Sequence, residues 1–201
     1  MADEVIRVLR HEAAAISALA DRLDWDSVDA VVDALVSTDG RVFAMGCGTS
    51  AMAAKKIVHT LNCVRCPASF LSPSDAPHGG LGVVRPGDIV FLVSKGGNTI
   101  ELTRLLPALT ELGATIVAVT GVAESEIATG ADIRLLVAVD SEPDPLDMLA
   151  TASTLSVMAL MDAVAICLMQ RNGFDSDWFG VVHPGGAVGA RLLAGKTEET
   201  D

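Results

Sequence analysis

The chain has 201 residues, half of them hydrophobic, which is long enough for one domain with a full core and too apolar for a disordered protein. Its formal net charge of −12 argues against a nucleic-acid partner, because the phosphates of a nucleic acid would be repelled. Any phosphate site in this chain therefore has to rely on backbone donors and a few cations.

The cysteines and the termini exclude further classes of protein. The four cysteines include Cys63 and Cys66, but no second pair has zinc-ligand spacing, so we expect incidental thiols in a reducing cytoplasm and no metal site. The charged, amphipathic N-terminus does not resemble a signal peptide. The apolar stretch 149–169 contains Asp162, which favours a core helix over a membrane span.

Periodicity predicts alternating helices and strands after two N-terminal helices. The predicted strands are 41–45, 68–71, 89–93, 115–120 and 133–139. The predicted helices are 3–23, a second one capped by Asp26 or Ser27 and running to about 36, 51–61, 99–112, 125–128, a long one over about 149–171, and 175–179. Alternation of this kind predicts a parallel sheet with right-handed crossovers and helices on both faces.

The segment after strand 89–93 is the most informative turn. The strand is an apolar, β-branched run that predicts burial on both faces, and it stops at Ser94. Gly96 and Gly97 precede a helical pattern that begins near Thr99, so backbone N–H groups at the helix start could bind a phosphate. The alternative is a plain turn with Thr99 or Asn98 as the helix cap.

Gly46 to Ser50 forms a second unit of strand, glycine turn and helix. Ligands of parallel α/β sheets bind at the carboxyl ends of the strands. Both glycine turns and the acidic loop 140–147 lie at such ends, so we expect the site there.

Three segments carry a resemblance to a known family: 46–50 (GCGTS), 94–99 (SKGGNT) and 183–189 (HPGGAVG). Together they resemble the SIS (sugar isomerase) domain, and more narrowly the arabinose-5-phosphate isomerases of the KpsF/GutQ type. The resemblance covers roughly residues 41–193. It implies a single SIS domain over 1–201, with N-terminal helices over about 3–37 and a sugar-phosphate-binding core. Relatives often carry paired CBS domains after this domain, and we expect none in this chain.

The resemblance implies an α/β fold, specifically a three-layer αβα sandwich with a five-stranded parallel sheet, flavodoxin-like. It also implies a cytoplasmic homodimer or homotetramer with sites shared between subunits. The implied activity is the isomerisation of an aldose phosphate to a ketose phosphate through an enediol, without a cofactor.

Carried over by position, the family's site residues fall on a small set of side chains. The implied phosphate contacts are Ser50, Ser94, Gly96 and Thr99, and His78 matches a histidine near the sugar. The implied acid/base positions are Glu101, Glu142 and His183. Thr49 stands where the family has a lysine, while Gly96 and Asn98 stand where it has Ser and Glu. We hypothesise that Lys95 supplies the missing charge from the other turn.

The reaction needs a base that removes a proton beside the carbonyl and a group that moves oxygen protons. Glu101 lies at a helix start that would lower its pKa, so we predict that it orients the substrate. Glu142 is the predicted enediol base, and His183 is predicted to open the ring or to move oxygen protons. The structural alternatives are a solvated helix carboxylate, an acidic loop and a turn histidine.

Two other functions stay open at this point. One is a non-catalytic protein that binds and senses a phosphosugar, which the change at Thr49 favours and the presence of Glu101, Glu142 and His183 opposes. The other is a structural partner subunit. His11 and His59 are expected to be surface or structural residues.

Overall fold

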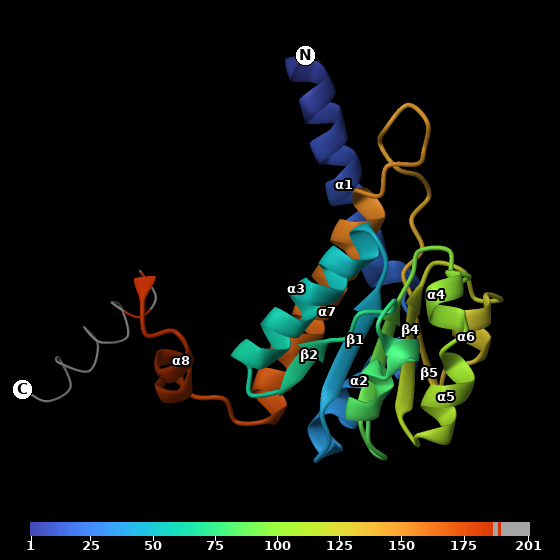
Figure 1. Cartoon of the computed structure of the whole chain (residues 1–201). Coiled ribbons are helices and arrows are strands. Elements are labelled where there is room, and N and C mark those ends of the chain that lie inside the picture. Colours follow the sequence, from blue (N-terminus) through green and yellow to red (C-terminus); the bar gives the residue numbers. More distant parts are fainter. Residues whose placement is uncertain (187–188, 190–201) are drawn as a thin grey trace, which may run out of the picture.

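The computed structural model describes residues 1–186 and residue 189, and it contains one all-parallel sheet with the strand order β2-β1-β3-β4-β5 (Figure 1). The strands are β1 (Val42–Gly46), β2 (Ala68–Phe70), β3 (Ile89–Val93), β4 (Thr115–Thr120) and β5 (Ile133–Leu136). The predicted three-layer α/β sandwich is confirmed, although the fifth strand ends at Leu136 rather than at Val139.

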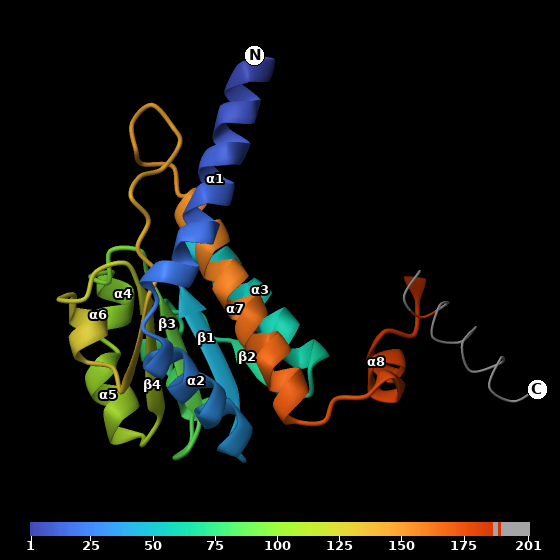
Figure 2. The same cartoon turned by 180° about the vertical axis from the view of Figure 1, so that it is seen from behind.

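Helices cover both faces of this sheet (Figures 1 and 2). The α-helices are α1 (Ala2–Arg22), α2 (Trp25–Ser37), α3 (Thr49–Cys63), α4 (Ile100–Thr103), α5 (Leu106–Glu111), α6 (Glu126–Thr129), α7 (Ala152–Arg171) and α8 (Ser176–Val182). Two 3-10 turns, η1 (Ala76–His78) and η2 (Gly80–Val83), lie between β2 and β3. The helices α2, α3 and α7 pack on one face of the sheet, and α4, α5 and α6 pack on the other.

The central strand β3 shows how the sequence builds two cores. Ile89, Phe91 and Val93 belong to the apolar cluster under α2, α3 and α7, whereas Val90 and Leu92 belong to the cluster under α4, α5 and α6. Successive side chains of a strand point to opposite faces, so an unbroken apolar run is needed where both faces are covered. All five side chains are buried, as predicted.

The predicted helix over 99–112 is wrong in one respect, because it is divided into α4 and α5. Pro107 lies in the first turn of α5. A proline has no N–H to donate to the carbonyl four residues earlier, here that of Thr103, and its ring crowds that carbonyl. The helix therefore stops after Thr103 and restarts at Leu106.

The helix α7 is long and apolar enough to cross a membrane by length and composition, but it is packed as a core helix. It contacts α1, α2 and α3, and half of its most apolar window is buried inside the domain. Asp162 on α7 pairs with Lys56 on α3. This polar residue, which interrupts the apolar run, therefore has a partner on the neighbouring helix.

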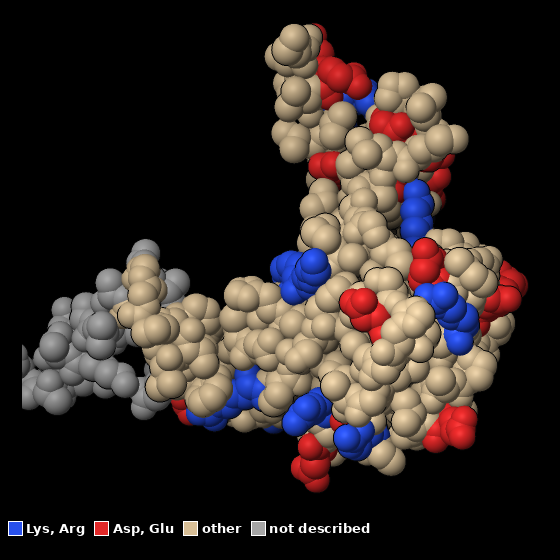
Figure 3. Space-filling view, viewed as in Figure 1, with Lys and Arg blue, Asp and Glu red and all other residues tan. Residues whose placement is uncertain are grey.

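Charged side chains of both signs are mixed on the face drawn in Figure 3. Lysines and arginines there lie among aspartates and glutamates and do not gather into a basic patch. With a net charge of −12, this face lacks the electrostatic footprint of a nucleic-acid-binding surface.

Candidate functional site

The two glycine turns lie side by side at the carboxyl edge of the sheet. β1 pairs with β2 on one side and with β3 on the other, so the strand order reverses at β1. The last residue of β1, Gly46, is in register with Val93, the last residue of β3. The turn 46–50 (the first glycine turn) and the turn 94–99 (the second glycine turn) therefore flank the point at which ligands of such folds bind.

Hydroxyl groups and glycine geometry shape the second glycine turn. The buried Ser94 Oγ accepts a hydrogen bond from Gly97 N at 3.0 Å and lies 2.8 Å from Thr99 Oγ1. Thr99 occupies the cap position of α4, but its side chain does not cap the helix. Gly97 has φ +67°, and a Cβ there would lie 2.0 Å from Ser125 Oγ. The turn can therefore form only with glycine at this position.

The second glycine turn leaves several backbone donors unused. Within residues 1–186 and 189, the N–H groups of Lys95, Gly96, Asn98 and Thr99 have no hydrogen-bond acceptor. A Cβ on Gly96 would meet nothing within 4 Å, so this part of the turn faces open space. The first N–H groups of α3, at Thr49 and Ser50, also have no partner inside their helix. Unpaired donors from two adjacent turns can bind an anion.

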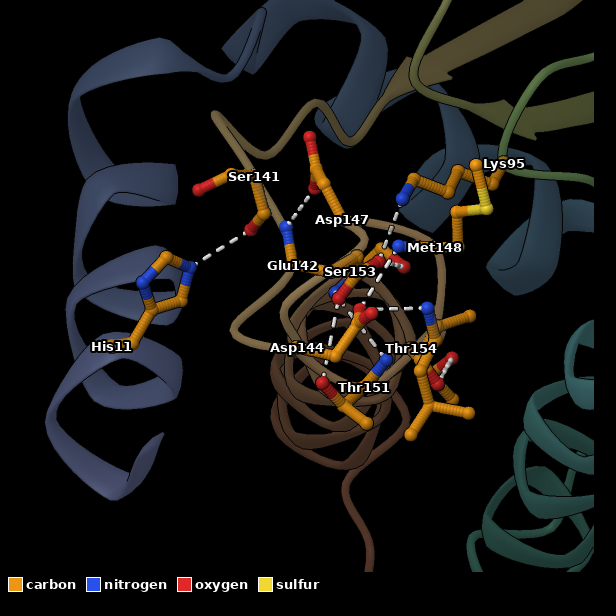
Figure 4. A network of polar contacts seen from close by, with 12 residues as sticks. His11, Lys95, Ser141, Glu142, Asp144, Asp147, Met148, Thr151, Ser153 and Thr154 are labelled. Carbon is orange, nitrogen blue, oxygen red and sulfur yellow. Dashed lines mark hydrogen bonds and ion pairs between the residues drawn. The ribbon is translucent and has the colours of Figure 1, made fainter. Parts of the chain in front are cut away.

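Glu142 and Lys95 form an ion pair above these turns (Figure 4). The Glu142 side chain is fully buried, and its Oε1 accepts from Lys95 Nζ at 2.7 Å and from Ser153 Oγ. Its Oε2 accepts from Thr151 N at 3.0 Å and from Ser153 N at 3.3 Å, at the start of α7. The carboxylate therefore caps α7, whose positive end stabilises the negative charge.

The contacts of Glu142 set its ionisation. Burial raises the pKa of this carboxyl, but the hydrogen bonds from Lys95, Ser153 and Thr151 together outweigh burial and lower the pKa to about 2. Glu142 is therefore a charged anchor across the physiological pH range.

This low pKa predicts an acid-dependent loss of stability. A pKa that is lower in the folded state adds stability above the unfolded value of 4.5, and this stability is lost as the pH falls from 4.5 towards 2. The stabilising effect of Glu142, measured as the free energy of unfolding of the wild type minus that of Glu142→Gln, should therefore shrink by about 2–3 kcal/mol between pH 6 and pH 2.5. Urea denaturation at each pH measures it. Glu111→Gln, at the exposed end of α5, is the matched control and should show no such change.

A narrow pocket lies beneath the ion pair. Its walls include Ser50, Lys95 and Ser153, together with Ala53, Val93, Val119, Thr120, Gly121, Val137, Ala150, Thr154 and Val157. Its volume of about 20 Å³ is far below the roughly 300 Å³ or more of a pocket that encloses a small-molecule ligand. The described part of one chain therefore supplies only part of the wall that a sugar phosphate would need.

Glu101, on α4, lies close enough to the first glycine turn to act on it electrostatically. Burial is the main cause that raises the pKa of the Cys47 thiol in that turn, and the nearby Glu101 carboxylate raises it further. Glu101 is half-buried, and it accepts no hydrogen bond from residues 1–186 or 189. Of the predicted acid/base groups, it is the one whose carboxylate is not already occupied.

His183 lies far from these residues in the same chain. Its Nε2 lies 3.6 Å from Cys63 Sγ, and its ring stacks on Phe179 of α8. Cys63 ends α3 and Thr49 begins it, so at roughly 1.5 Å per residue they are about 21 Å apart. Figure 1 shows α8 standing away from the sandwich. The rest of the predicted 183–189 motif is described only at residues 184–186 and 189.

His78 is exposed at the end of η1, and no hydrogen bond joins it to the other candidate residues within the described part of the chain. The structure thus brings together Ser50, Ser94, Lys95, Thr99 and Glu142, and it places Glu101 beside the first glycine turn. It does not bring His183 or His78 to them.

A cavity of about 610 Å³ lies at the opposite end of the sheet. Its wall includes Arg41, Arg85 and Asp88. Both oxygens of the buried Asp88 carboxylate accept backbone N–H groups, from Arg41 and Arg85, each at 2.7 Å. Asp88 therefore ties two loops together at the amino ends of the strands, where ligands of this fold do not bind.

The hydrogen-bond partners of Glu142 at the start of α7 could not be found from the sequence pattern alone. Thr151 and Ser153 are not among the residues predicted from the sequence, and their contacts to Glu142 span nine to eleven residues of chain. The available signal was a run of hydroxyl residues at the start of a helix with an acidic residue in the preceding loop.

Comparison with known proteins identifies the family. A match to the SIS domain covers residues 35–166, most of the chain. The chain belongs to the SIS domain family. The predicted membership is confirmed on a segment that contains both glycine turns and Glu142.

Named relatives are arabinose 5-phosphate isomerases. The arabinose 5-phosphate isomerase KdsD of Pseudomonas aeruginosa is 38% identical over 187 residues, which is 93% of this chain and 57% of that protein. The enzyme of the same name from Shigella flexneri is 39% identical over 77% of this chain and 47% of that protein. This SIS domain chain thus spans about half the length of the curated relatives it matches.

Two solved structures agree with this fold along nearly their whole length. A Listeria monocytogenes protein, provisionally described as a sugar-phosphate isomerase, superposes with a TM-score of 0.89 at 46% identity, covering 91% of this chain and 96% of that one. The c3406 protein of Escherichia coli CFT073, solved in complex with arabinose 5-phosphate, superposes with a TM-score of 0.86 at 29% identity, covering 90% and 95%.

Proposed function

We propose that this protein is an aldose–ketose isomerase of a sugar phosphate, most similar in activity to arabinose 5-phosphate isomerase. The observation that carries the proposal is a pair of adjacent glycine turns with unused N–H donors, next to a lysine held by a buried glutamate. The named relatives and the sugar-phosphate complex of a structural neighbour support this choice of substrate class.

The phosphoryl group is proposed to bind the two glycine turns. Its oxygens would accept N–H groups from Gly96 and Thr99 and from the start of α3, and the hydroxyls of Ser50, Ser94 and Thr99 can add donors. Thr49 contributes only a backbone N–H and a hydroxyl. The cation of this site therefore has to come from elsewhere.

Lys95 is proposed to be that cation. It lines the pocket beneath the turns, and its side chain is 45% exposed, so a ligand can reach the ammonium while Glu142 holds it from the buried side. A fixed ammonium at this place can stabilise the negative charge that develops on the carbonyl oxygen as the enediol forms.

The proton-transfer roles follow from the surroundings of the two glutamates. A carboxylate with a pKa of about 2 is a weak base, so the contacts favour Glu142 as the anchor of Lys95 over its predicted role as the enediol base. Glu101, half-buried and unoccupied, is the better placed base to move the proton between the two carbons.

His183 is proposed to act in a site of a neighbouring subunit. In its own chain it lies about 20 Å from the first glycine turn, because it contacts the far end of α3. The pocket of one chain is also too narrow to enclose a sugar phosphate. A cytoplasmic homodimer or homotetramer, in which α8 of one subunit completes the site of another, would explain both the distance of His183 from its own glycine turns and the narrow pocket.

Isotope exchange tests the proposed reaction. The protein is incubated in deuterated water with arabinose 5-phosphate and, separately, with other pentose 5-phosphates and hexose 6-phosphates. We expect ketose phosphate to form with deuterium at a carbon of the former enediol, detected by NMR and mass spectrometry. If no sugar phosphate exchanges while arabinose 5-phosphate still raises the melting temperature, the protein is a phosphosugar-binding sensor, and the isomerase proposal is wrong.

A further inference from the structure

We infer that Asn98 is a positioning residue, which holds the second glycine turn in its anion-binding shape by joining it to the start of α6. The inference rests on the proposed function, because it concerns the same phosphate site. Asn98 is exposed, and its side chain reaches out of the turn towards the connection between β4 and α6.

Three acceptors of the turn bind this connection. Asn98 Oδ1 accepts from Glu126 N at 2.9 Å, and Gly97 O accepts from Ile127 N at 3.0 Å. Lys95 O accepts from Gly121 N at 2.9 Å and from Thr120 Oγ1 at 3.2 Å. In each of these hydrogen bonds, the glycine turn provides the acceptor, and the segment from the end of β4 to the start of α6 provides the donor.

The second glycine turn supplies hydrogen-bond acceptors for the start of the short helix α6. A helix leaves its first N–H groups without intrahelical acceptors. In α6, those of Glu126 and Ile127 donate to the turn, and that of Ala128 donates to Ser125 Oγ at 3.4 Å. Because these donors are already used, α6 itself offers no anion site, and it acts as a clamp on the turn.

Peptide geometry connects this clamp to phosphate binding. In a trans peptide, the carbonyl of one residue and the N–H of the next point in opposite directions. Fixing Lys95 O on Gly121 N therefore directs the Gly96 N–H away from the β4–α6 connection, and fixing Gly97 O on Ile127 N does the same for the Asn98 N–H. These are two of the unused donors of the turn.

Asn98 is the part of the clamp that a side-chain substitution can remove. Asn98→Ala deletes the acceptor, and Glu126→Pro deletes the matching donor from the other side. Proline suits the first position of a helix, and Ser125, with φ −68° and ψ 157°, already has the extended backbone that a residue before proline prefers. Glu126→Ala is the matched control, because it removes the same carboxylate but keeps the N–H.

The experiment measures the dissociation constant of inorganic phosphate by calorimetry, and the KM and kcat for arabinose 5-phosphate. We expect Asn98→Ala and Glu126→Pro each to raise both the dissociation constant and KM about tenfold, with a smaller change in kcat. The double variant should be no weaker than either single variant, since both remove one hydrogen bond. Glu126→Ala should bind phosphate as the wild type does.

Three results with the variants would overturn the inference. Unchanged phosphate binding in either single variant would do so, as would effects that multiply in the double variant. A lower melting temperature of the variants with an unchanged KM would show that the clamp stabilises the fold without positioning the ligand. Wild-type protein that binds neither phosphate nor arabinose 5-phosphate would overturn the proposed function as well, which separates the two failures.

Discussion

Lys95→Met is expected to lower kcat/KM for the sugar phosphate by about 10²–10³-fold. Methionine keeps the length of the side chain but removes the ammonium that Glu142 holds 2.7 Å away. The site would then contain a buried carboxylate without its cation, and no fixed positive charge would meet the oxyanion of the enediol. Steady-state kinetics with arabinose 5-phosphate, or with whichever sugar phosphate the wild type converts, measures the loss.

Lys56→Met is the control for the loss of a paired lysine outside the site. Lys56 lies on α3 and pairs with Asp162 on α7, and both side chains are partly exposed. This variant should keep kcat/KM within about twofold and lose at most about 1 kcal/mol of stability. Retention of more than a tenth of the activity by Lys95→Met would contradict the role of Lys95.

Local pattern was sufficient to predict the layers of the fold. The apolar run of β3 and the glycines after β1 and β3 are short-range signals, and they located the carboxyl edge of the sheet where the site lies. Gly113, with φ +72°, ends its helix as expected of a glycine cap. Pro107 was an equally local signal that the continuous helical pattern obscured.

The roles inside the site could not be predicted from local pattern, because they depend on contacts between distant segments. Glu142 was predicted as a base from its place in a loop. The hydrogen bonds that lower its pKa come from Lys95, 47 residues away, and from the start of α7. The same holds for Asn98, whose partner Glu126 N is 28 residues away. The lowered pKa of Glu142 and the hydrogen bond that Asn98 accepts both depend on contacts that form only when the chain folds.

His183→Ala and Lys95→Met are expected to restore activity to each other when the two inactive proteins are mixed. If His183 acts in the site of a neighbouring subunit, a mixed oligomer contains sites that take Lys95 from one chain and His183 from the other. After unfolding and refolding of an equal mixture, about a quarter of the sites should be complete, so about a quarter of the wild-type activity should return.

The mixture of His183→Ala with His183→Ala carrying a tag is the control, and it should stay inactive while forming the same oligomers. If each site took both residues from one chain, a mixed oligomer would contain no complete site, and the Lys95 and His183 variants would stay inactive together. That outcome would require α8 to fold back over roughly 20 Å towards its own glycine turns, against its contact with Cys63 at the far end of α3. The mixing experiment therefore decides between a site shared by two subunits and a large rearrangement within one.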